Sequence, residues 1–532
     1  MIRHGKSRAS GGGSPNEAER STDRQVRDKI KTIDEMGVLA YQLHAAGRTI
    51  TLVHGTFDLL HMGHVRHLES ARREGDILMV TVTADAHVIR TPDRPVFADH
   101  MRAEMLAALE YVDFVGVHDG VSAIDVIRTI RPEAYVKGAD YANPEDDVTG
   151  KIVDERNAVE EHGGRLVITK DITFSSSSLL NKHFDLYDPE LRDYLDDMRE
   201  SGAVNEILEL IERVKDFRVL LVGDAIVDEY QFVMPLGKSP KEMMIATQFE
   251  NREVFAGGVF AAANHIASFC KEIEVITSLG NLDSHEELIR KNLKPNVRLT
   301  PLHRDGVPTT RKSRFIESGY MRKVFEVYFM DDSPLDAPME TALNTLIKER
   351  AGDFDVVIAT DFGHGLIGPS TTRTLVDTAR FLAVNTQTNS ANAGFNLVTK
   401  YPKADYVCID APEARLATRE RTKDIDTVIS ELLPGVIECS RLTVTHGTNG
   451  CVTFETGQGV TKIPAFTKTV VDTVGAGDAF LAVTAPIVAA GGRMDLVGFI
   501  GNAAGAIKVS ILGHRQSVEK PRLVKFLTTL LK

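Results

Sequence analysis

The feature that most constrains this sequence is the alternation of short apolar runs with amphipathic stretches. From Thr49 it reads TITLVHG, GHVRHLESARREG and DILMVTVTAD, which are spacings typical of strand, helix and strand. Elements that alternate in this way form a parallel sheet with crossover helices. The alternation stops at Asp185 and resumes at Arg218. Because a chain of 532 residues exceeds what one core usually supports, the sequence predicts two α/β domains.

The interruption is a charged segment, DLYDPELRDYLDDMRESGAVNEILELIERVKDF, that carries its own helical signal. Ile207, Ile211 and Val214 recur at helical spacing within it. We therefore expect a helical linker whose last helix packs onto the second domain. The predicted divisions are residues 1–30 as a disordered leader, 31–184 as the first domain, 185–216 as the linker and 217–532 as the second domain.

Composition narrows the partners and the compartment. A formal net charge of −13 argues against general binding to nucleic acid or to anionic membranes, so small molecules are the expected partners. The four cysteines have no CxxC spacing and are expected to be free thiols in a reducing compartment. The N-terminus has no apolar signal core, and no run of 18 apolar residues occurs. These features favour a cytoplasmic protein.

The connection HGTFDLLHMGH is the first candidate site. It joins a predicted strand at residues 52–53 to a predicted helix at residues 65–73, and ligands of open parallel sheets bind at the carboxyl ends of the strands. Gly55 and Gly63 let the backbone approach a ligand closely. The helix that begins near Gly63 points free N–H groups at the same place, which favours an anion.

His61 and His64 are expected to face this ligand. Imidazoles can donate hydrogen bonds to the charge that builds up on a phosphorus under attack. The pair could instead be packing residues or metal ligands, but no cysteine stands at ligand spacing. The length of GTFDLLHMGH favours a nucleotide site.

The stretch VVDTVGAGDAFLAV is the second candidate site. Its glycines stand at the predicted start of a helix, where they form a nest of N–H groups able to hold a phosphoryl group in transfer. Asp478 follows directly and is placed to take the proton from an attacking hydroxyl. The alternative is a structural glycine turn with a capping aspartate.

The first domain resembles the cytidylyltransferase-like nucleotidyltransferases with an HxGH motif, over about residues 49–182. RPVFADHMRAEMLAAL, YVKGADY and FSSSSLL carry the resemblance together with the histidine pair. It implies a Rossmann-like fold in which His61 and His64 contact the triphosphate as catalytic residues. The other implied nucleotide contacts are Gly55, Thr56, Phe57, Arg102, Lys137, Ser176 and Ser177. A solvated Lys or Arg and a serine-rich turn are the alternatives for the last four.

The late block of this domain bears on the nucleotide. Lipid-precursor cytidylyltransferases of the family carry RTEGISTT there, whereas this chain reads KDITFSSSS. This difference favours ATP over CTP. The block resembles that of the adenylyltransferase half of the bifunctional heptose kinase/adenylyltransferases.

The second domain resembles the ribokinase-like (PfkB) carbohydrate kinases over roughly residues 218–532. VGDAIVDEY, AGGVFAAANHIA, ATDFGHG, IDAPEARLA, VTHGTNG and DTVGAGD occur in the family's order. The resemblance implies the following roles: Asp228, Gly257 and Gly258 bind sugar; Asp410 and Glu413 bind magnesium; Thr445, Gly447 and Gly450 contact nucleotide; Gly475, Ala476 and Gly477 form an anion hole; and Asp478 is the base. A turn aspartate for Asp228 and an ordinary helix start at Asp410 are the alternatives.

Two further features concern the sugar. EMMIATQFENREVF and TTRKSRFIESGYMRKVFEVYF have strand periodicity and suit the small β lid of this family, which often pairs two subunits, so a homodimer through the lid is expected. Ala261 stands where the heptose kinases have Asn, and His364 stands where they have Lys. Both positions are expected to touch the sugar or its phosphate, so the identity of the sugar stays open.

Together these resemblances imply a bifunctional sugar kinase and sugar-phosphate nucleotidyltransferase that makes a nucleotide-activated sugar such as ADP-heptose. Both halves are expected to use Mg²⁺ to offset triphosphate charge. Two alternatives stay open. One is a nucleotidyltransferase whose kinase-like half only senses a sugar, and the other is a CTP-dependent cytidylyltransferase fused to a kinase.

Overall fold

A computed structural model describes residues 26–88, 95–120, 122–138, 151–169 and 187–532. The predictions at Ser176 and Ser177, and most of the predicted leader, lie outside these residues. The chain divides into two compact units, residues 1–186 with Lys532 and residues 187–531. Each unit is described by itself below.

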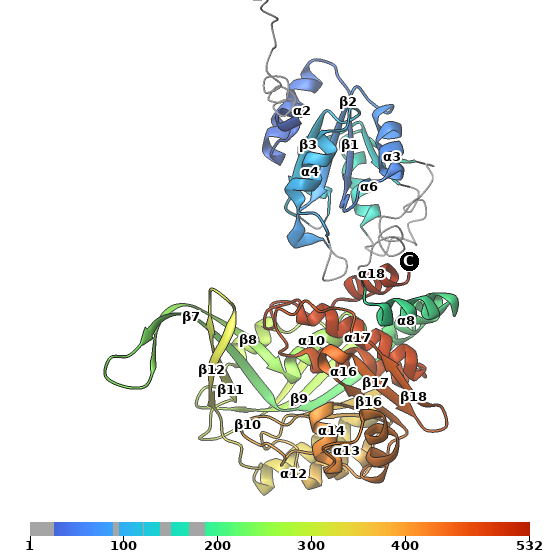
Figure 1. Ribbon diagram of the computed structural model, residues 1–532. Coiled ribbons are helices and arrows are strands. Elements are labelled where there is room, and N and C mark those ends of the chain that lie inside the picture. The colour runs from blue at the N-terminus through green and yellow to red at the C-terminus, as the bar shows by residue number, and fades with distance from the viewer. Residues whose placement is uncertain (1–25, 89–94, 121, 139–150, 170–186) are drawn as a thin grey trace, which may run out of the picture. The chain divides into compact units, whose positions relative to one another are not determined.

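The first unit alternates strands and helices, as the sequence predicts (Figure 1). Its elements are α2 (Ile33–Ala45), β1 (Ile50–Gly55), α3 (Met62–Arg72), β2 (Ile77–Thr83), α4 (Asp99–Ala107), β3 (Phe114–His118), α5 (Ile124–Ile130), β4 (Ala134–Lys137), α6 (Ile152–Glu160) and β5 (Arg165–Ile168).

Its five strands form a parallel sheet in the order β3-β2-β1-β4-β5. Successive residues of β1 enter two different cores, Leu52 on one face and Val53 on the other, so the strand is buried on both faces. Chain order reverses at β1, because β2 and β4 pair with its opposite edges. The carboxyl ends of β1 and β4 therefore flank the crevice where such sheets bind ligands.

The end of the predicted leader belongs to the folded unit. Ile30 forms a bridge with Val115 of β3, and the Lys29 ammonium donates to the carbonyl oxygens of Leu109 (3.1 Å) and Val112 (2.8 Å). The predicted boundary at residue 30 is therefore too late for the residues that the structure describes.

The second unit contains two sheets and the helices that cover them. Its elements are α8 (Pro189–Glu200), α9 (Ala203–Arg213), β6 (Arg218–Gly223), β7 (Ala225–Lys238), β8 (Ile245–Gly258), α10 (Val259–Ile266), β9 (Glu272–Gly280), α11 (Glu286–Asn292), β10 (Val297–Arg304), β11 (Arg311–Glu317), β12 (Arg322–Phe329), α12 (Ala337–Arg350), β13 (Val356–Asp361), α13 (Pro369–Thr378), β14 (Leu382–Thr386), β15 (Tyr406–Asp410), α14 (Ala411–Thr418), α15 (Ile425–Thr427), β16 (Arg441–Thr445), β17 (Cys451–Glu455), β18 (Gly459–Ile463), α16 (Ala476–Ala489), α17 (Met494–Val509) and α18 (Lys520–Leu530).

The larger sheet has nine strands in the order β10-β9-β6-β13-β14-β15-β16-β17-β18. It is parallel from β10 to β16, and β17 and β18 add an antiparallel edge. Two apolar cores pack against it; α16 and α17 contribute to one, and α12 and α14 contribute to the other. Chain order reverses at β6, so the carboxyl ends of β6 and β13 open toward a ligand.

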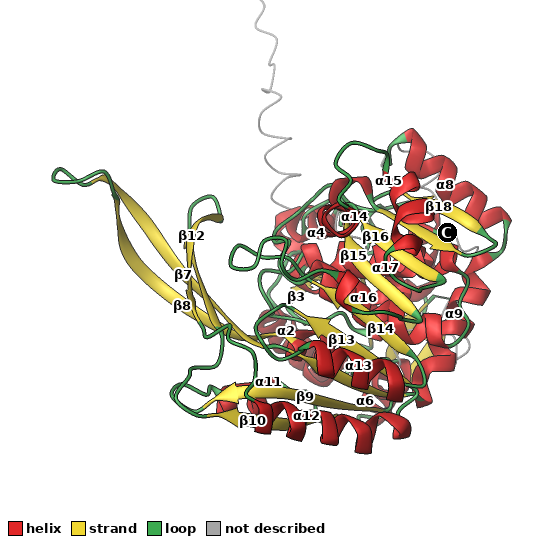
Figure 2. Cartoon of the chain, turned by 90° about the horizontal axis from the view of Figure 1, so that it is seen from below, coloured by secondary structure: helices red, strands yellow, loops and turns green. Residues whose placement is uncertain are grey.

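The smaller sheet has the order β12-β11-β7-β8 and confirms the strand periodicity seen in the sequence. Strands β7 and β8 are each 14 residues long and extend away from the nine-stranded sheet (Figure 2). Their far halves and the turn that joins them expose apolar side chains, among them Met243 of the turn and Ile245 and Phe249 of β8.

The described part of the segment expected to be a linker, residues 187–216, belongs to the second unit. We expected only its last helix to pack, and Ile207, Ile211 and Val214 are indeed buried there. Leu191 and Leu195 of α8 lie in the same core, so both helices belong to this unit. The charged face of α8 hid that apolar stripe in the sequence.

All four cysteines are buried free thiols, as expected. Among the described residues, the helices are too short or too polar to cross a bilayer.

Candidate active sites

The histidine pair of the first unit lies at the carboxyl end of β1. His61 caps α3, with its Nδ1 accepting from the N–H of Gly63 (3.1 Å), and His64 lies in the first turn. The two imidazole rings are stacked with centroids 4.0 Å apart, and the Phe57 ring packs against His64 at 5.2 Å. The predicted nucleotide residues Gly55, Thr56 and Phe57 thus form the turn directly beside the pair.

His61 carries a donor that the described protein does not use. Because its Nδ1 accepts a backbone hydrogen bond, the ring proton is assigned to Nε2. That Nε2 is buried and has no hydrogen-bond partner among the described residues. Burial also lowers the pKa of His61, which favours the neutral ring. An unpaired buried donor calls for an unseen acceptor, and a phosphate oxygen would serve.

The side chain of Arg102 is held by protein groups in this structure, and its nucleotide contact stays a prediction. Its side chain is fully buried, and its guanidinium donates to the carbonyl oxygens of Thr56, Phe97 (2.9 Å) and Thr83 (2.9 Å) and to Asp85 (2.5 Å). In this structure Arg102 therefore holds the turn after β1 and does not face an open site. The sequence block around it could not show this, because three of its four partners, Thr56, Thr83 and Asp85, lie outside the block.

Lys137 ends β4, beside the histidine pair's strand. Its ammonium pairs with Glu155 of α6 at 3.2 Å, and both side chains are buried. Glu155 also accepts from the Tyr135 hydroxyl (3.0 Å) and the N–H of Ala123 (3.0 Å). Glu155 thus holds in place the Lys137 ammonium, which is predicted to contact a phosphate.

The second unit contains a cavity of about 860 Å³ between the lid sheet and the carboxyl ends of the main sheet. It brings together residues from most of the motifs of the second domain. The predicted site residues that line it are Asp228, Gly258, Asp410, Glu413, Thr445, Gly447, Gly450, Gly475, Ala476, Gly477 and Asp478. Segments separated by some 250 residues therefore meet in one site.

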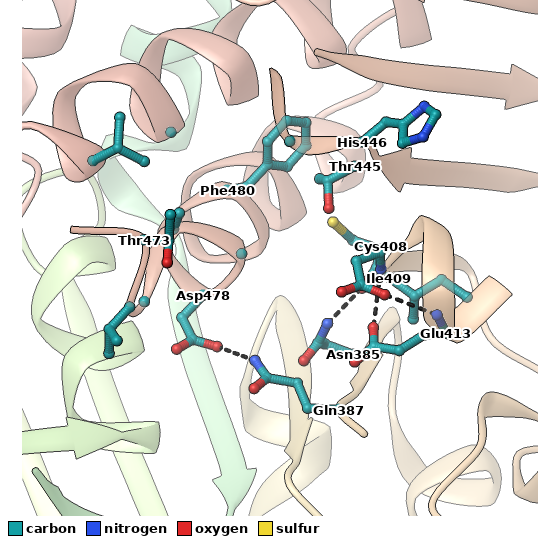
Figure 3. Close-up of a pocket in the computed structure, with 18 of the residues that line it drawn as sticks. Asn385, Gln387, Cys408, Ile409, Glu413, Thr445, His446, Thr473, Asp478 and Phe480 are labelled. Carbon is teal, nitrogen blue, oxygen red and sulfur yellow. Dashed lines mark hydrogen bonds between the residues drawn. The ribbon is translucent and has the colours of Figure 1, made fainter. Parts of the chain in front are cut away.

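Asp478 projects from the first turn of α16 into this cavity (Figure 3). Its Oδ1 accepts from the Gln387 side chain at 2.6 Å. Burial raises the pKa of Asp478 to about 6, although His514 opposes the shift. A carboxyl group with that pKa is ionised at neutral pH and still basic enough to take a proton.

The loop before Asp478 supplies open N–H groups. Gly475 has a left-handed backbone (φ 76°), and helix α16 begins after it without a side-chain cap. The N–H of Ala476 donates to the Thr473 carbonyl (3.2 Å), so this member of the predicted anion hole is already used. Within the described residues, the N–H groups of Gly477 and Asp478 have no acceptor and lie where an anion would be stabilised.

Asp410 and Glu413 form a capping box at the start of α14. Asp410 Oδ1 accepts from the N–H of Glu413 (2.8 Å), and Glu413 Oε2 accepts from the N–H of Asp410 (2.9 Å). The alternative interpretation of these two residues, an ordinary helix start, therefore also agrees with the geometry. Burial, and then the nearby Asp410 charge, raises the pKa of Glu413.

The same two carboxylates fit a magnesium ion chemically. Asn385 Oδ1 and Thr388 Oγ1 are buried beside them in the cavity and lack hydrogen-bond partners among the described residues. Carboxylate, amide and hydroxyl oxygens are the ligands that Mg²⁺ prefers. A cation there would also offset the Asp410 charge, which adds to burial in raising the pKa of Glu413.

Asp228 lies at the lid end of the cavity. It pairs with Arg314 of β11, and its Oδ2 lies 3.0 Å from Nε2 of His514. Burial alone would raise its pKa, but Arg314 and the hydrogen bond from His514 hold the pKa of Asp228 well below its usual range. A Cβ at Gly257 would lie 1.9 Å from Asp228 Oδ2, so only glycine fits there.

Sequence motifs missed several polar residues of the cavity. Four of them are Gln387, Lys312, Arg314 and His514. Two of them lie on lid strand β11 and one in the loop after α17, where nothing in the local sequence marks them. Conversely, neither Ala261 nor His364 lines this cavity. Ala261 faces a separate cavity of about 130 Å³, and His364 pairs with Asp332 at 2.9 Å.

Comparison with known proteins agrees with this geometry. Residues 217–521, more than half of the chain, match the family model described as pfkB family carbohydrate kinase. The chain belongs to this family. Residues 52–182 match the model described as cytidylyltransferase-like. The pfkB kinase domain is thus joined to a nucleotidyltransferase-like domain, as the sequence indicates.

Curated relatives match the N-terminal portion of this pfkB-family chain. The proteins named "Bifunctional protein HldE" from Syntrophotalea carbinolica, Campylobacter fetus and Geobacter sulfurreducens are 38%, 42% and 34% identical over 145, 115 and 165 residues. These matches cover 27%, 21% and 30% of this chain and 28%, 24% and 32% of the relatives. The chain therefore spans a third or less of their length. Phosphofructokinase-2 from Escherichia coli, a solved structure, covers 59% of this chain with its whole length at 14% identity and a TM-score of 0.49.

Proposed function

We propose that this protein is a bifunctional enzyme that phosphorylates a sugar and then transfers a nucleotide to a sugar phosphate. The observation that carries the proposal is the placement of Asp478 beside the open N–H groups of its helix, in a cavity that also holds Asp228. A base, an anion site and a sugar-binding carboxylate in one cavity are what phosphoryl transfer to a hydroxyl requires. The family model over residues 52–182 supports the second activity.

In the kinase reaction, Asp228 accepts hydrogen bonds from sugar hydroxyls and fixes the acceptor. The oxygen of the attacking sugar hydroxyl bonds to the γ-phosphorus of ATP, and ADP leaves. Asp478 takes the proton from that hydroxyl. The N–H groups of Gly477 and Asp478 stabilise charge on the phosphoryl group in transfer. Gln387 orients the carboxylate of Asp478 through its hydrogen bond.

Magnesium is part of the proposal for both reactions. Asp410, Glu413 and Asn385 would hold it in the kinase cavity, where it supplies positive charge against the nucleotide phosphates.

In the nucleotidyltransferase reaction, a sugar phosphate oxygen attacks the α-phosphorus of a nucleoside triphosphate and pyrophosphate leaves. His61 donates from Nε2 to the triphosphate, and the start of α3 directs its positive end to the same anion. His64 is proposed to share this role. The block KDITFSSSS favours ATP as the donor.

The sugar is proposed to carry an anionic group. Lys312 on the lid is buried, lines the cavity and lies 5.3 Å from the Tyr328 ring centroid. Burial lowers the pKa of this ammonium, and an anion from the substrate would stabilise its charged form. Lys312 and Arg314 together favour a sugar phosphate over a neutral sugar.

The protein is also proposed to dimerise through the lid. The lid strands and the turn between β7 and β8 expose a set of apolar side chains that water solvates poorly. Its members are Met243, Met244, Ile245, Phe249, Phe325, Val327 and Phe329. A second copy of the same lid is the occupant we propose for this surface.

The kinase rate is expected to fall as pH drops through about 6, because Asp478 must be ionised to accept a proton. Below that pH the rate should fall about tenfold per unit, as the ionised fraction does. Initial rates from pH 5 to 8 measure this limb, with nucleotidyl transfer in the same buffers as the control for unfolding. A flat kinase profile down to pH 5 would count against Asp478 as the base.

The donor of the nucleotidyltransferase is tested by pyrophosphate release. ATP, CTP, GTP and UTP are each combined with a panel of sugar 1-phosphates under equal Mg²⁺. ATP should give the highest kcat/KM. A tenfold preference for CTP, about 1.4 kcal/mol in transition-state binding, would contradict the proposed adenylyl transfer.

A further inference from the structure

Lys508 is a buried lysine that the proposed mechanism does not use. It lies near the end of α17, a helix of mostly apolar residues, and its side chain has 0% exposure. Lysine is almost never fully buried, because removing an ammonium from water is costly unless the protein satisfies it. Its retention in this core calls for a specific reason.

The partners of Lys508 are two carbonyl groups beside the active site. Its Nζ donates to the carbonyl oxygens of Val474 (2.7 Å) and Gly513 (2.8 Å), and within the described residues it forms no ion pair. Val474 directly precedes Gly475 of the anion loop. Gly513 directly precedes His514, which bonds the sugar-site carboxylate Asp228.

A carboxylate, that of Asp472, binds the N–H groups of the same two residues. Asp472 accepts from the N–H of Val474 (3.1 Å) and from the N–H of Gly513 (2.8 Å). Lys508 therefore fixes the carbonyls, and Asp472 fixes the amides, of one pair of residues. This arrangement leaves neither residue free to rotate its peptide groups.

Lys508 and Asp472 together form a clamp on Val474 and Gly513, and this clamp also contacts the lid and the loop before Asp478. Asp472 also accepts from the Tyr230 hydroxyl (2.5 Å) and from Lys323 of β12 (2.7 Å). A Cβ at Gly475 would lie 3.3 Å from Cε of Lys508, so the lysine stem packs directly under the loop. Burial lowers the pKa of Lys508, whereas the nearby carboxylates Asp472 and Asp478 favour its charged form.

We propose that Lys508 is a positioning residue for phosphoryl transfer, a built-in cation that holds Val474 and Gly513 and thereby fixes the anion loop. This inference rests on the proposed kinase function. The ammonium also places positive charge behind the loop where negative charge builds up in the transition state. It acts through the loop and not through contact with the substrate.

Lys508→Met keeps the length of the side chain but removes its donors and its charge. By analogy with the loss of one oxyanion-hole donor, kcat of sugar phosphorylation should fall about 10²- to 10³-fold. The KM values for ATP and sugar should change little, because the loop acts mainly in the transition state. Nucleotidyl transfer by the same protein should keep the wild-type rate, which controls for folding and concentration.

Lys508→Ala supplies a readout that a merely structural role would not move. It leaves a space beside two unpaired carbonyl oxygens, which ammonium ions can enter. Ammonium chloride should raise the phosphorylation rate of Lys508→Ala at least about tenfold, because the ion replaces the missing donor. Choline chloride at equal ionic strength should not, because its methyl groups donate no hydrogen bond. Lys520→Met, at a partly exposed lysine paired with Glu212, is the matched control and should leave all rates unchanged.

Two outcomes would overturn the inference. One is a Lys508→Met enzyme with wild-type kcat, and the other is a slow Lys508→Ala enzyme indifferent to ammonium. Hydrogen exchange of residues 472–478 decides the case separately from catalysis. Faster exchange in Lys508→Met supports the clamp even if the wild type phosphorylates no sugar, a result that would remove only the proposed kinase function. Unchanged exchange would remove the clamp.

Discussion

Asp478→Asn is expected to slow sugar phosphorylation by about 10²- to 10⁴-fold, the usual contribution of a general base. Asparagine keeps the shape of the side chain and its contact with Gln387, and the helix N–H groups stay in place. The variant loses only the ability to accept a proton. ATP consumption against a panel of sugars and sugar phosphates, wild type beside variant, measures the change. Nucleotidyl transfer to a supplied sugar phosphate should be nearly unaffected.

Asp377→Asn is the matched control, because Asp377 is an exposed residue at the end of α13. It should phosphorylate sugar at the wild-type rate. If Asp478→Asn kept the wild-type rate with every active sugar, Asp478 would not be the base. If no sugar stimulated ATP consumption by the wild type, yet a sugar changed the rate of nucleotidyl transfer, the kinase-like domain would be a sensor.

His61→Ser is expected to lower the rate of nucleotidyl transfer by about 10²- to 10³-fold through loss of the Nε2 donor. Serine is chosen because it still caps α3, so the start of the helix should stay intact. His64→Ala should cause a loss of similar size. Pyrophosphate release with saturating sugar 1-phosphate measures both.

Kinase activity of the same two variants should survive, since the histidine pair occurs only in the first unit. His162→Ala, an exposed histidine of that unit, is the matched control and should be silent. Loss of phosphorylation in a folded His61→Ser protein would mean that the two sites are not chemically separate. Full nucleotidyl transfer in that variant would remove His61 from the mechanism.

Much of the architecture could be predicted from the sequence because parallel sheets leave a local signal. Mostly apolar strands such as β2, glycine turns and amphipathic helices each fit within some ten residues, so the two α/β units and the lid strands were predictable. Motifs such as GTFDLLHMGH and DTVGAGDAF are equally local. They placed the histidine pair and Asp478 at helix starts, where the structure has them.

The rest depends on contacts between distant segments, which a single sequence does not display. Arg102 turns into the core because four partners lie around it. Lys312 and His514 reach the cavity from the lid and from the loop after α17. Lys508 looks like a misplaced charge in an apolar helix until the fold brings Val474 to it. The packing of α8 was hidden because its apolar stripe is narrow.

The most direct test of the two-reaction account follows the phosphates of ATP in a single wild-type reaction. ATP labelled at the γ-phosphate or at the α-phosphate is incubated with Mg²⁺ and each sugar of the panel, and the products are separated. The account predicts γ-label in a sugar phosphate and α-label in a nucleotide sugar, with pyrophosphate released. If the γ-label never enters a sugar product while the α-label still does, the kinase half of the account is contradicted.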